Sequence, residues 1–431
     1  MAKIVKLISK NCGKIVPGSV EDYVKAGGYT GLRKAMKMDP QEIIEEVKKS
    51  NLMGRGGAGY PTGKKWEQAY ANPRRPEYVV CNGDEGEPGT YKDRLILSQD
   101  PLRLIEGMTI AAYVFNIKEG YIYVRGEYLD LKDTINDAIK NAEEANYLGK
   151  NILGSDFSFH IQVVWGAGAY VCGENTALLE SIEGKSGRPR KKPPFLTRVG
   201  LHQAPTLLQN VETYSNISYI VEHGGEKYHS YGTEYSGGTK LVCLSGNIAN
   251  KGVYEIPFGT PIREIIYETG GGIPGGRNLK FVQLGGSSGS CFKDEKLDTP
   301  MCYKALKDAG LKLGSGALLV IDDSNCVIDF LKCITEFFIH ESCGKCTPCR
   351  EGNTRIFELL DKLSKGIAGK EDMDRLCEIS DLMKKTSFCG LGQAATTALT
   401  DCIKYMKDEF LEHIEGYCRA GVCNMSGKEK I

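Results

Sequence analysis

The sequence lacks a net charge, a long apolar run and a secretion signal. Its 431 residues contain 55 Lys plus Arg and 55 Asp plus Glu, so it has no basic excess with which to bind nucleic-acid phosphates. No stretch of roughly 18 apolar residues occurs, which excludes a membrane-spanning helix. Lysines interrupt the first residues, unlike a secretion signal. We therefore expect a cytoplasmic protein with no nucleic-acid partner and no membrane insertion.

Cysteine and glycine, in contrast, are abundant. Sixteen cysteines in a chain without a secretion signal indicate a reducing compartment, with metal-binding or core roles rather than disulfides. The 52 glycines exceed average usage and gather in loops, which favours close approach of the backbone to ligands. The length allows two or three domains with their own cores.

Two residues separate each of the three cysteines Cys343, Cys346 and Cys349 from the next. This spacing is typical of [4Fe–4S] ligands, but the ferredoxin pattern would place its next Cys where Asn353 stands. A fourth ligand must therefore come from a distant segment. Cys389 is the best candidate, because its flanking glycines let backbone N–H groups approach the sulfur. A zinc ion, or thiols without metal, remain alternatives.

The other cysteines after this loop have different contexts. Cys377 and Cys402 lie in helical patterns that predict core positions. His413, Cys418 and Cys423 are separated by four residues each. They form part of a predicted zinc site whose fourth ligand lies elsewhere in the chain or in a partner, or else they are unliganded thiols near the end of the chain.

A glycine-rich segment at 54–59 satisfies the pattern G-x-G-x-x-G. A dinucleotide fingerprint must follow a strand and open a helix. Here the pattern follows a predicted helix, which begins after Asp39 with Pro40 in its first turn and runs to about residue 52, and it leads into Pro61. We therefore reject the ordinary fingerprint but expect the loop's N–H groups to face a phosphate or a flat ring, with lysines at 64 and 65 adding charge. A flexible surface loop is the alternative.

Two further segments combine a predicted strand with a polar loop. The strand at 77–81 precedes an acidic loop at 82–89, where α/β proteins bind ligands, although a solvated turn would look the same. The spacing of its carboxylates fits no EF-hand. The strand at 159–165 leads through a glycine-rich loop into a helix at 177–182, an order that suits phosphate or ribose contact. A basic, proline-rich stretch at 187–194 either lines a groove or is a solvated linker.

The remaining periodicity suggests several domains. A strand at 120–124 lies between helices at 102–114 and 131–148. Strands at 239–244, 280–284 and 317–321 suggest a small α+β domain. Helices at 327–341, 352–365, 371–385 and 393–414 suggest a helical bundle. The predicted boundaries are 1–235, 236–323, 324–415 and a cysteine-containing tail at 416–431.

From about residue 20 to 414, the order of the glycine loop, the acidic loop, Gly173-Glu174 and the cysteine loop resembles the FMN-containing, NADH-binding flavoprotein subunit of respiratory complex I. It also resembles the diaphorase subunits of soluble NAD(P)-linked [FeFe]-hydrogenases and formate dehydrogenases. The segment at 11–13 and the C-x4-C tail are more similar to this second group. Members of that group often carry an additional thioredoxin-like domain in front and ferredoxin-like domains behind, neither of which we expect here.

The resemblance implies a fold and a set of site residues. The fold is a Rossmann-like α/β domain for FMN and the nicotinamide nucleotide, a ubiquitin-like (soluble-ligand-binding β-grasp) α+β domain, and a C-terminal four-helix bundle that carries an iron–sulfur cluster. The implied FMN residues are Gly54, Arg55, Gly56, Gly57, Lys65, Asn82, Asp84, Glu85, Gly173, Glu174, Asn210 and Thr213. The implied nucleotide residues are Tyr60, Glu87, Asn175, Lys192 and Phe195, and the implied [4Fe–4S] ligands are Cys343, Cys346, Cys349 and Cys389.

The resemblance also implies a function. Hydride passes between NAD(P)H and FMN without a catalytic side chain. Electrons then pass singly through the cluster to a [2Fe–2S] centre on a thioredoxin-like subunit, and onward to a hydrogenase or formate dehydrogenase subunit. The rival interpretations are a complex I subunit and an electron-wire subunit without nucleotide turnover. The terminal acceptor and electron bifurcation are left open.

Three positions depart from the family pattern. Asn175 replaces a Glu that binds the adenosine ribose, and a neutral amide does not repel a 2′-phosphate as a carboxylate does. The preference between NADH and NADPH is therefore left open. Gln68 replaces an aromatic residue beside the adenine, which predicts a weaker stack, and Gln209 replaces an Asn of the flavin site.

Overall fold

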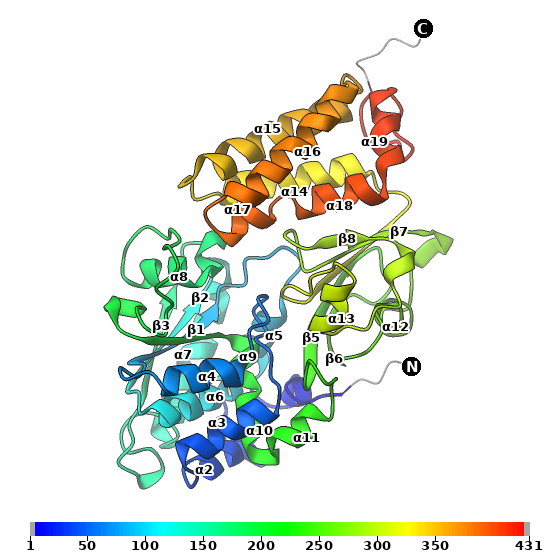
Figure 1. The fold of residues 1–431 in the computed structure, drawn as a ribbon. Helices are drawn as coiled ribbons and strands as arrows, with labels where there is room; N and C mark the ends of the chain where they lie inside the picture. The colour runs from blue at the N-terminus through cyan, green and yellow to red at the C-terminus, as the bar shows by residue number, and fades with distance from the viewer. Residues whose placement is uncertain (1–4, 426–431) are drawn as a thin grey trace.

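The computed structural model describes residues 5–425. Residues 1–4 of the first predicted domain and 426–431 of the predicted tail lie outside this range. Two β-sheets lie next to each other, and the helices of the C-terminal quarter lie across one end of both (Figure 1). This arrangement confirms the predicted fold class, with a parallel α/β sheet, a second smaller domain with its own sheet and a helical C-terminal region.

The first sheet is parallel and has the strand order β3-β2-β1-β4. Its strands are β1 (Tyr78–Gly83), β2 (Glu119–Val124), β3 (His160–Trp165) and β4 (Thr206–Asn210). The chain builds outward from β1 in one direction and then returns to place β4 on its other side. The switch point is therefore between β1 and β4, and α/β sheets of this kind bind ligands just beyond the carboxyl ends of such strands.

Helices cover both faces of this sheet, as the parallel arrangement requires. Alternate residues of β1 enter different cores: Val79 and Cys81 join the core that contains α6 (Pro101–Phe115), and Val80 joins the core that contains α8 (Asn175–Ile182). This explains why β1 reads as a continuous apolar run. Helix α7 (Lys132–Glu144) packs beside α6.

Further helices surround this core. The predicted capping of α3 (Pro40–Lys49) is confirmed, since the Asp39 side chain accepts from the N–H of Gln41 and the Glu42 side chain accepts from the N–H of Asp39. The remaining helices of this part are α1 (Val20–Lys25), α2 (Thr30–Ala35), α4 (Thr62–Tyr70), α5 (Lys92–Gln99), α9 (Val211–Ser215), α10 (Ile217–His223) and α11 (Gly225–His229). Most are short, and their periodicity spans too few turns to be recognised in the sequence.

The second sheet is mixed, in the order β6-β5-β9-β7-β8. Strands β5 and β9 pair in parallel, and the other pairs are antiparallel. The strands are β5 (Thr239–Gly246), β6 (Gly252–Pro257), β7 (Leu279–Leu284), β8 (Ser290–Phe292) and β9 (Ala317–Asp322), with helices α12 (Ile262–Glu264) and α13 (Tyr303–Asp308). These elements enclose a separate apolar core.

The C-terminal helices are α14 (Val327–Glu341), α15 (Thr347–Ser364), α16 (Lys370–Thr386), α17 (Gly390–Ala394), α18 (Thr397–Tyr405) and α19 (Lys407–Ile414). Two details of the prediction were wrong. Helix α15 begins earlier than residue 352, because Pro348 is favourable in a first helical turn. The single helix predicted at 393–414 is three helices, because Thr396 and Met406 have non-helical backbone conformations. Cys402 is buried as predicted, whereas Cys377 is exposed.

Among residues 5–425, no helix combines the length and apolar character needed to cross a bilayer.

The contact between α6 and α9 gives a stability test. A Cβ atom on Gly107 would lie 2.0 Å from the carbonyl oxygen of Tyr214, so Gly107→Ala should lower stability by about 1–3 kcal/mol. The same change in an unobstructed helix interior usually stabilises by about 1 kcal/mol. Gly390→Ala is the control, since nothing lies within 4 Å of its Cβ position. Thermal unfolding of both variants checks this, and an unchanged midpoint for Gly107→Ala would contradict the packing.

Candidate functional site

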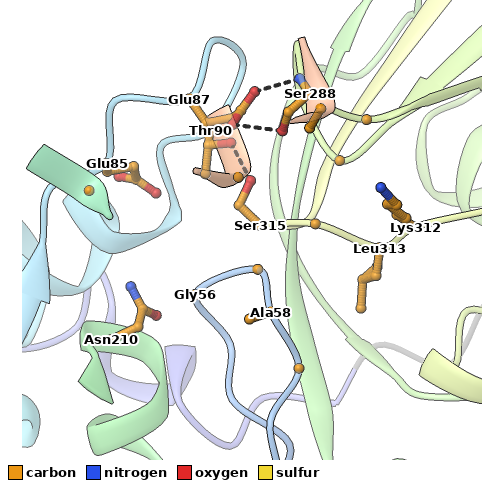
Figure 2. A pocket seen from close by; sticks show the side chains of 18 of the residues that line it. Gly56, Ala58, Glu85, Glu87, Thr90, Asn210, Ser288, Lys312, Leu313 and Ser315 are labelled. Carbon is orange, nitrogen blue, oxygen red and sulfur yellow. Dashed lines mark hydrogen bonds between the residues drawn. The ribbon is translucent and has the colours of Figure 1, made fainter. Parts of the chain in front are cut away.

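A cleft of about 1030 Å³ opens beyond the carboxyl ends of β1 and β4. In Figure 2, Glu85 and Asn210 enter it from the first sheet, Gly56 and Ala58 lie on a loop between the two sheets, and Ser288 and Ser315 come from the second sheet. The cleft therefore lies at the switch point and has walls from both sheets. A smaller pocket of about 100 Å³ adjoins it and shares Gly56, Asn82 and Asn210 with it.

The glycine loop fits closely between the two walls. A Cβ atom on Gly56 would lie 2.9 Å from Cβ of Asn210, and one on Gly59 would lie 2.5 Å from the ring of Tyr303. Only glycine fits at these places without displacing a neighbour. The loop can therefore present bare backbone to a ligand in the cleft.

Arg55 supports this loop from behind. Its guanidinium is fully buried and donates to the hydroxyl of Tyr228 at 3.0 Å and the carbonyl of Gly237 at 2.9 Å. Its backbone N–H donates to the Thr213 hydroxyl at 2.9 Å. The side chains of Arg55 and Thr213 thus fix the position of the loop. The Arg55 guanidinium donates its hydrogen bonds to other groups of the protein.

The acidic loop follows β1 directly. Burial raises the pKa of Asp84 to about 7, and burial together with Asp93 raises the pKa of Glu85 to about 7. Glu85 nevertheless accepts hydrogen bonds from the N–H groups of Asp93 and Arg94 and from the Tyr128 hydroxyl. Its carboxyl is therefore fixed in place at the edge of the cleft.

Neighbouring polar residues tie this loop to the rest of the cleft. The amide of Asn82 donates to the carbonyl of Gly173 at 2.9 Å, and the amide of Asn210 donates to Asp93 at 2.6 Å. Glu87 accepts from the Tyr170 hydroxyl and, at 3.2 Å, from the Ser288 hydroxyl, so it connects the two walls (Figure 2).

Lys65 lies in the wall of the smaller pocket. Its ammonium donates to the carbonyl of Leu208 at 3.0 Å. Burial, with a smaller effect of Lys192, lowers the Lys65 pKa to about 8. A cation destabilised in this way would be stabilised by an anion bound in the pocket.

Two of the residues expected to contact a nucleotide, Tyr60 and Asn175, line this smaller pocket. Glu174 caps α8, accepting from the N–H of Thr176 at 2.9 Å, and Lys192 donates to it at 2.5 Å. Asn175 is the first residue of α8 and lines the pocket. At the surface, Tyr60 is 41% and Phe195 is 62% exposed, so both rings have free area.

The two glutamines noted in the sequence have different places. The Tyr60 hydroxyl donates to Gln68 at 2.9 Å, so Gln68 orients this ring by a hydrogen bond rather than by stacking. Gln209 is buried in β4 and accepts from the Trp66 indole at 3.2 Å.

The structure brings the four predicted cluster cysteines together around a separate pocket, the cysteine pocket. Cys343 follows α14, Cys346 precedes α15, Cys349 lies in the first turn of α15, and Cys389 precedes α17. Burial raises the pKa of the Cys389 thiol, and the nearby backbone N–H groups at 391 and 392 oppose this by favouring the thiolate.

This cysteine pocket shares a wall with the cleft. Val171 and Leu391 line both. Two hydrogen bonds hold the bundle there: the N–H of Tyr170 donates to Glu341 at 2.8 Å, and Lys345 donates to the carbonyl of Pro189 at 2.6 Å. A group held by the cysteines would therefore lie next to a ligand in the cleft.

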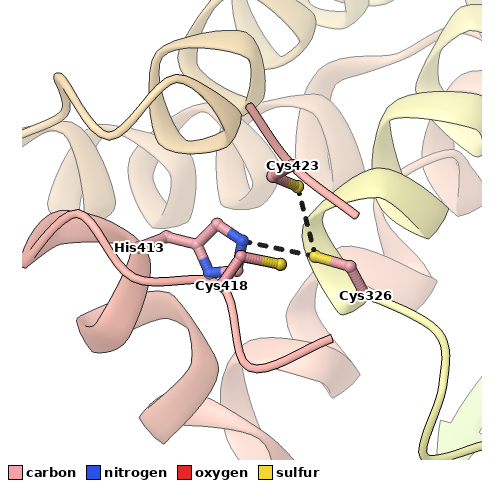
Figure 3. A group of neighbouring side chains, drawn as sticks. All are labelled: Cys326, His413, Cys418 and Cys423. Carbon is pink, nitrogen blue, oxygen red and sulfur yellow. Dashed lines mark hydrogen bonds between the residues drawn. The ribbon is translucent and has the colours of Figure 1, made fainter. Parts of the chain in front are cut away.

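His413, Cys418 and Cys423 also come together, with Cys326 as a fourth neighbour (Figure 3). Sequence analysis missed Cys326, which precedes α14 with no neighbouring metal-ligand pattern. It also missed Ser288, Tyr303, Lys312 and Ser315, the contribution of the second sheet to the cleft. The glycine- and serine-rich segment at 285–289 was the available signal.

Comparisons with known proteins agree with this geometry. Residues 47–219 match the Nuo51 FMN-binding domain, residues 241–291 match the SLBB domain, and residues 329–413 match the NADH-ubiquinone oxidoreductase-F iron-sulfur binding region. The chain is 43% identical to the corresponding NADH-quinone oxidoreductase protein of Aquifex aeolicus over 94% of each protein. The chain belongs to the NADH-quinone oxidoreductase-F family.

The family includes proteins of other complexes. The chain is 42% identical to the NADP-reducing hydrogenase subunit HndC of Solidesulfovibrio fructosivorans, over 98% of this chain and 86% of that protein. A structure of an NAD⁺-reducing [NiFe]-hydrogenase in the H₂-reduced state matches with a TM-score of 0.83 at 32% identity, covering 96% of this chain and 68% of that one. As a family member, this chain is an NAD(P)H oxidoreductase subunit with FMN and [4Fe–4S] regions, and works within a multisubunit complex.

Proposed function

We propose that this chain is the diaphorase subunit of an NAD(P)-linked hydrogenase or formate dehydrogenase complex. The observation that carries this proposal is the shared wall of Val171 and Leu391 between the cleft and the cysteine pocket. When bound, FMN exchanges a hydride with a nicotinamide and single electrons with an iron–sulfur cluster, so the two groups must lie close together.

The residues of the cleft fit FMN. The glycine loop leaves no room for side chains where it meets Asn210 and Tyr303, which suits a flat ring. Lys65 is a cation that lacks hydration and suits a phosphate. We assign FMN binding to Gly54, Gly56, Gly57, Lys65, Asn82, Asp84, Glu85, Gly173, Glu174 and Asn210, with Arg55 and Thr213 holding the loop.

We assign the nicotinamide nucleotide to the adjoining surface. Tyr60 and Phe195 have exposed rings that suit the adenine, with Glu87, Asn175 and Lys192 contributing polar contacts. Asn175 carries no charge, and Lys192 lies beside Glu174, so this surface accepts a 2′-phosphate. We therefore propose that NADPH as well as NADH is a substrate.

We assign the [4Fe–4S] ligands to Cys343, Cys346, Cys349 and Cys389. Four thiolate donors are the set that such a cluster requires. Two of them precede helices, where unpaired backbone N–H groups stabilise negative charge. The domain boundaries at 236 and 324 then separate nucleotide, β-grasp and cluster-binding parts.

The proposed partners are a thioredoxin-like [2Fe–2S] subunit and a catalytic hydrogenase or formate dehydrogenase subunit. Similarity to the hydrogenase subunit over 98% of this chain supports this choice. The second candidate, a subunit of a membrane-attached complex I, is supported by the 43% identity to the Aquifex aeolicus NADH-quinone oxidoreductase protein. Co-purification with the partner subunits distinguishes the two candidates. Only the hydrogenase or formate dehydrogenase complex should catalyse hydrogen- or formate-dependent reduction of NAD(P)⁺.

The Lys65 assignment predicts a pH-dependent affinity for FMN. Lys65→Met should weaken binding by about 1.5–3 kcal/mol, the contribution of a charged hydrogen bond. In the wild type, affinity should fall as the pH rises above about 8, because Lys65 of the flavin-free protein then loses the proton that the bound phosphate requires. Quenching of FMN fluorescence by flavin-free protein measures this. Lys64→Met is the control, and a variant at Lys65 with wild-type affinity and pH profile would contradict the assignment.

The Asn175 assignment predicts a change in nucleotide preference. Asn175→Glu should lower kcat/KM for NADPH roughly tenfold or more, because its carboxylate repels the 2′-phosphate, and should change the value for NADH much less. Asn175→Gln, which stays neutral, controls for size. Anaerobic bleaching of the flavin band by each nucleotide measures the effect. If NADPH does not reduce the wild-type flavin, Asn175 does not relax the preference.

The cluster assignment predicts which cysteine is needed for iron. Cys389→Ser should remove most of the iron and the broad visible absorption of the cluster while leaving FMN bound. Cys377→Ser is the control, because Cys377 is exposed on α16. Iron analysis and EPR of the reduced protein distinguish the two. Equal iron contents would remove Cys389 from the ligand set.

A further inference from the structure

A second group of potential metal ligands lies apart from the cleft. Cys326, His413, Cys418 and Cys423 have ligand atoms that all lie within 4.8 Å of one another. The sulfur of Cys326 is 3.3 Å from Nε2 of His413 and 3.5 Å from the sulfur of Cys423. Figure 3 shows the four side chains pointing toward one another. Three sulfurs and one ring nitrogen thus surround a common centre.

The hydrogen bonding of His413 leaves one ring nitrogen available to a metal. Its Nδ1 lies 2.6 Å from the carbonyl oxygen of Glu409. A carbonyl can only accept a hydrogen bond, so Nδ1 carries the proton and Nε2 presents its lone pair to the sulfurs. A backbone carbonyl that orients the ring in this way is typical of metal-binding histidines. The ring is also fully buried, so its orientation is fixed.

The spacing and donor set suit zinc. With Zn–S bonds of about 2.3 Å and Zn–N bonds of about 2.0–2.1 Å, a tetrahedral site separates its ligand atoms by about 3.5–3.8 Å. The observed separations of 3.3 and 3.5 Å are close to these values. Three thiolates and one imidazole form a closed structural site, with no position left for a water or a substrate.

The position of the group suggests what a metal would do. Cys326 immediately precedes α14, shortly after the last strand of the second sheet, and His413 lies in the last turn of α19. Glu409 of α19 also pairs with Lys280 of β7 at 2.8 Å. Cys418 and Cys423 lie beyond α19. The four residues therefore join the chain after the last helix to the junction between the second sheet and the helical bundle.

We propose that Cys326, His413, Cys418 and Cys423 bind one Zn²⁺ ion, which fixes the chain after α19 onto the start of α14. The site takes no part in hydride or electron transfer, since no ligand position is open and zinc has no redox chemistry. A disulfide between Cys326 and Cys423 is the rival explanation. Their sulfurs are 3.5 Å apart, far beyond the bonded distance of about 2.05 Å.

The first test uses the intact protein, purified without oxygen and with its flavin and iron bound. Elemental analysis should find one zinc per chain beside the cluster iron. X-ray absorption at the zinc edge should show three sulfurs at about 2.3 Å and one nitrogen at about 2.0–2.1 Å. A protein without zinc, a zinc shell with fewer sulfurs, or iron in place of zinc would overturn the proposal. So would a Cys326–Cys423 disulfide detected by thiol labelling and mass spectrometry.

The second test removes ligands. The double variant Cys418→Ser and Cys423→Ser should lose zinc and become sensitive to trypsin after Arg419, which lies between the two cysteines. Cys333→Ser is the matched control, because Cys333 is exposed on α14, and it should keep zinc and trypsin resistance. Flavin reduction by NADH should remain in both, which separates this proposal from the proposed function. Zinc retained by the double variant would overturn the ligand assignment, and the absorption experiment decides the matter if that variant does not fold.

Discussion

The site depends on one buried carboxylate, that of Glu212. It lies at the start of α9, is fully buried, and accepts from Lys240 at 2.6 Å and from the N–H of Leu241 at 2.9 Å. Lys92 pairs with it at 3.2 Å, and Arg55 lies 4.0 Å away. Although burial opposes it, these cations lower the pKa of Glu212 below its ordinary value. Removal of one partner from such a buried group usually costs about 3–5 kcal/mol.

These charges connect both sheets and both ligand loops of the cleft. Lys92 follows the acidic loop, Arg55 belongs to the glycine loop, and Lys240 belongs to β5 of the second sheet. Glu212 itself follows Asn210, whose side chain accepts its N–H at 3.1 Å. The two sheets and the two ligand loops are therefore held together by one buried ionic centre. The buried Arg55 side chain, which supports the glycine loop, is part of this centre.

Many local features could be predicted because they depend on neighbouring residues. The cap at Asp39, helix α14 and strand β7 follow from capping and periodicity, and the Cys389 context followed from its glycines. The predictions failed where the signal was short or non-local. Strand β4 has only five residues, and the breaks near Thr396 and Met406 interrupt an otherwise continuous helical pattern. Cys377 was expected in the core because one face of α16 looked apolar there, but the helix turns it outward.

The sequence alone determined the ligand types and their local spacing. These are glycines that leave backbone N–H groups accessible, carboxylates that follow a strand, and cysteines separated by two residues. It also determined the family, since these motifs have a fixed order. Only the tertiary structure decided which distant residues meet. It placed Cys326 beside His413, gave the cleft a wall from the second sheet, and put Val171 and Leu391 between the cleft and the cysteine pocket. Spacing along the chain constrains contacts within a turn or a loop, whereas contacts between distant segments are fixed only when sheets and helices pack.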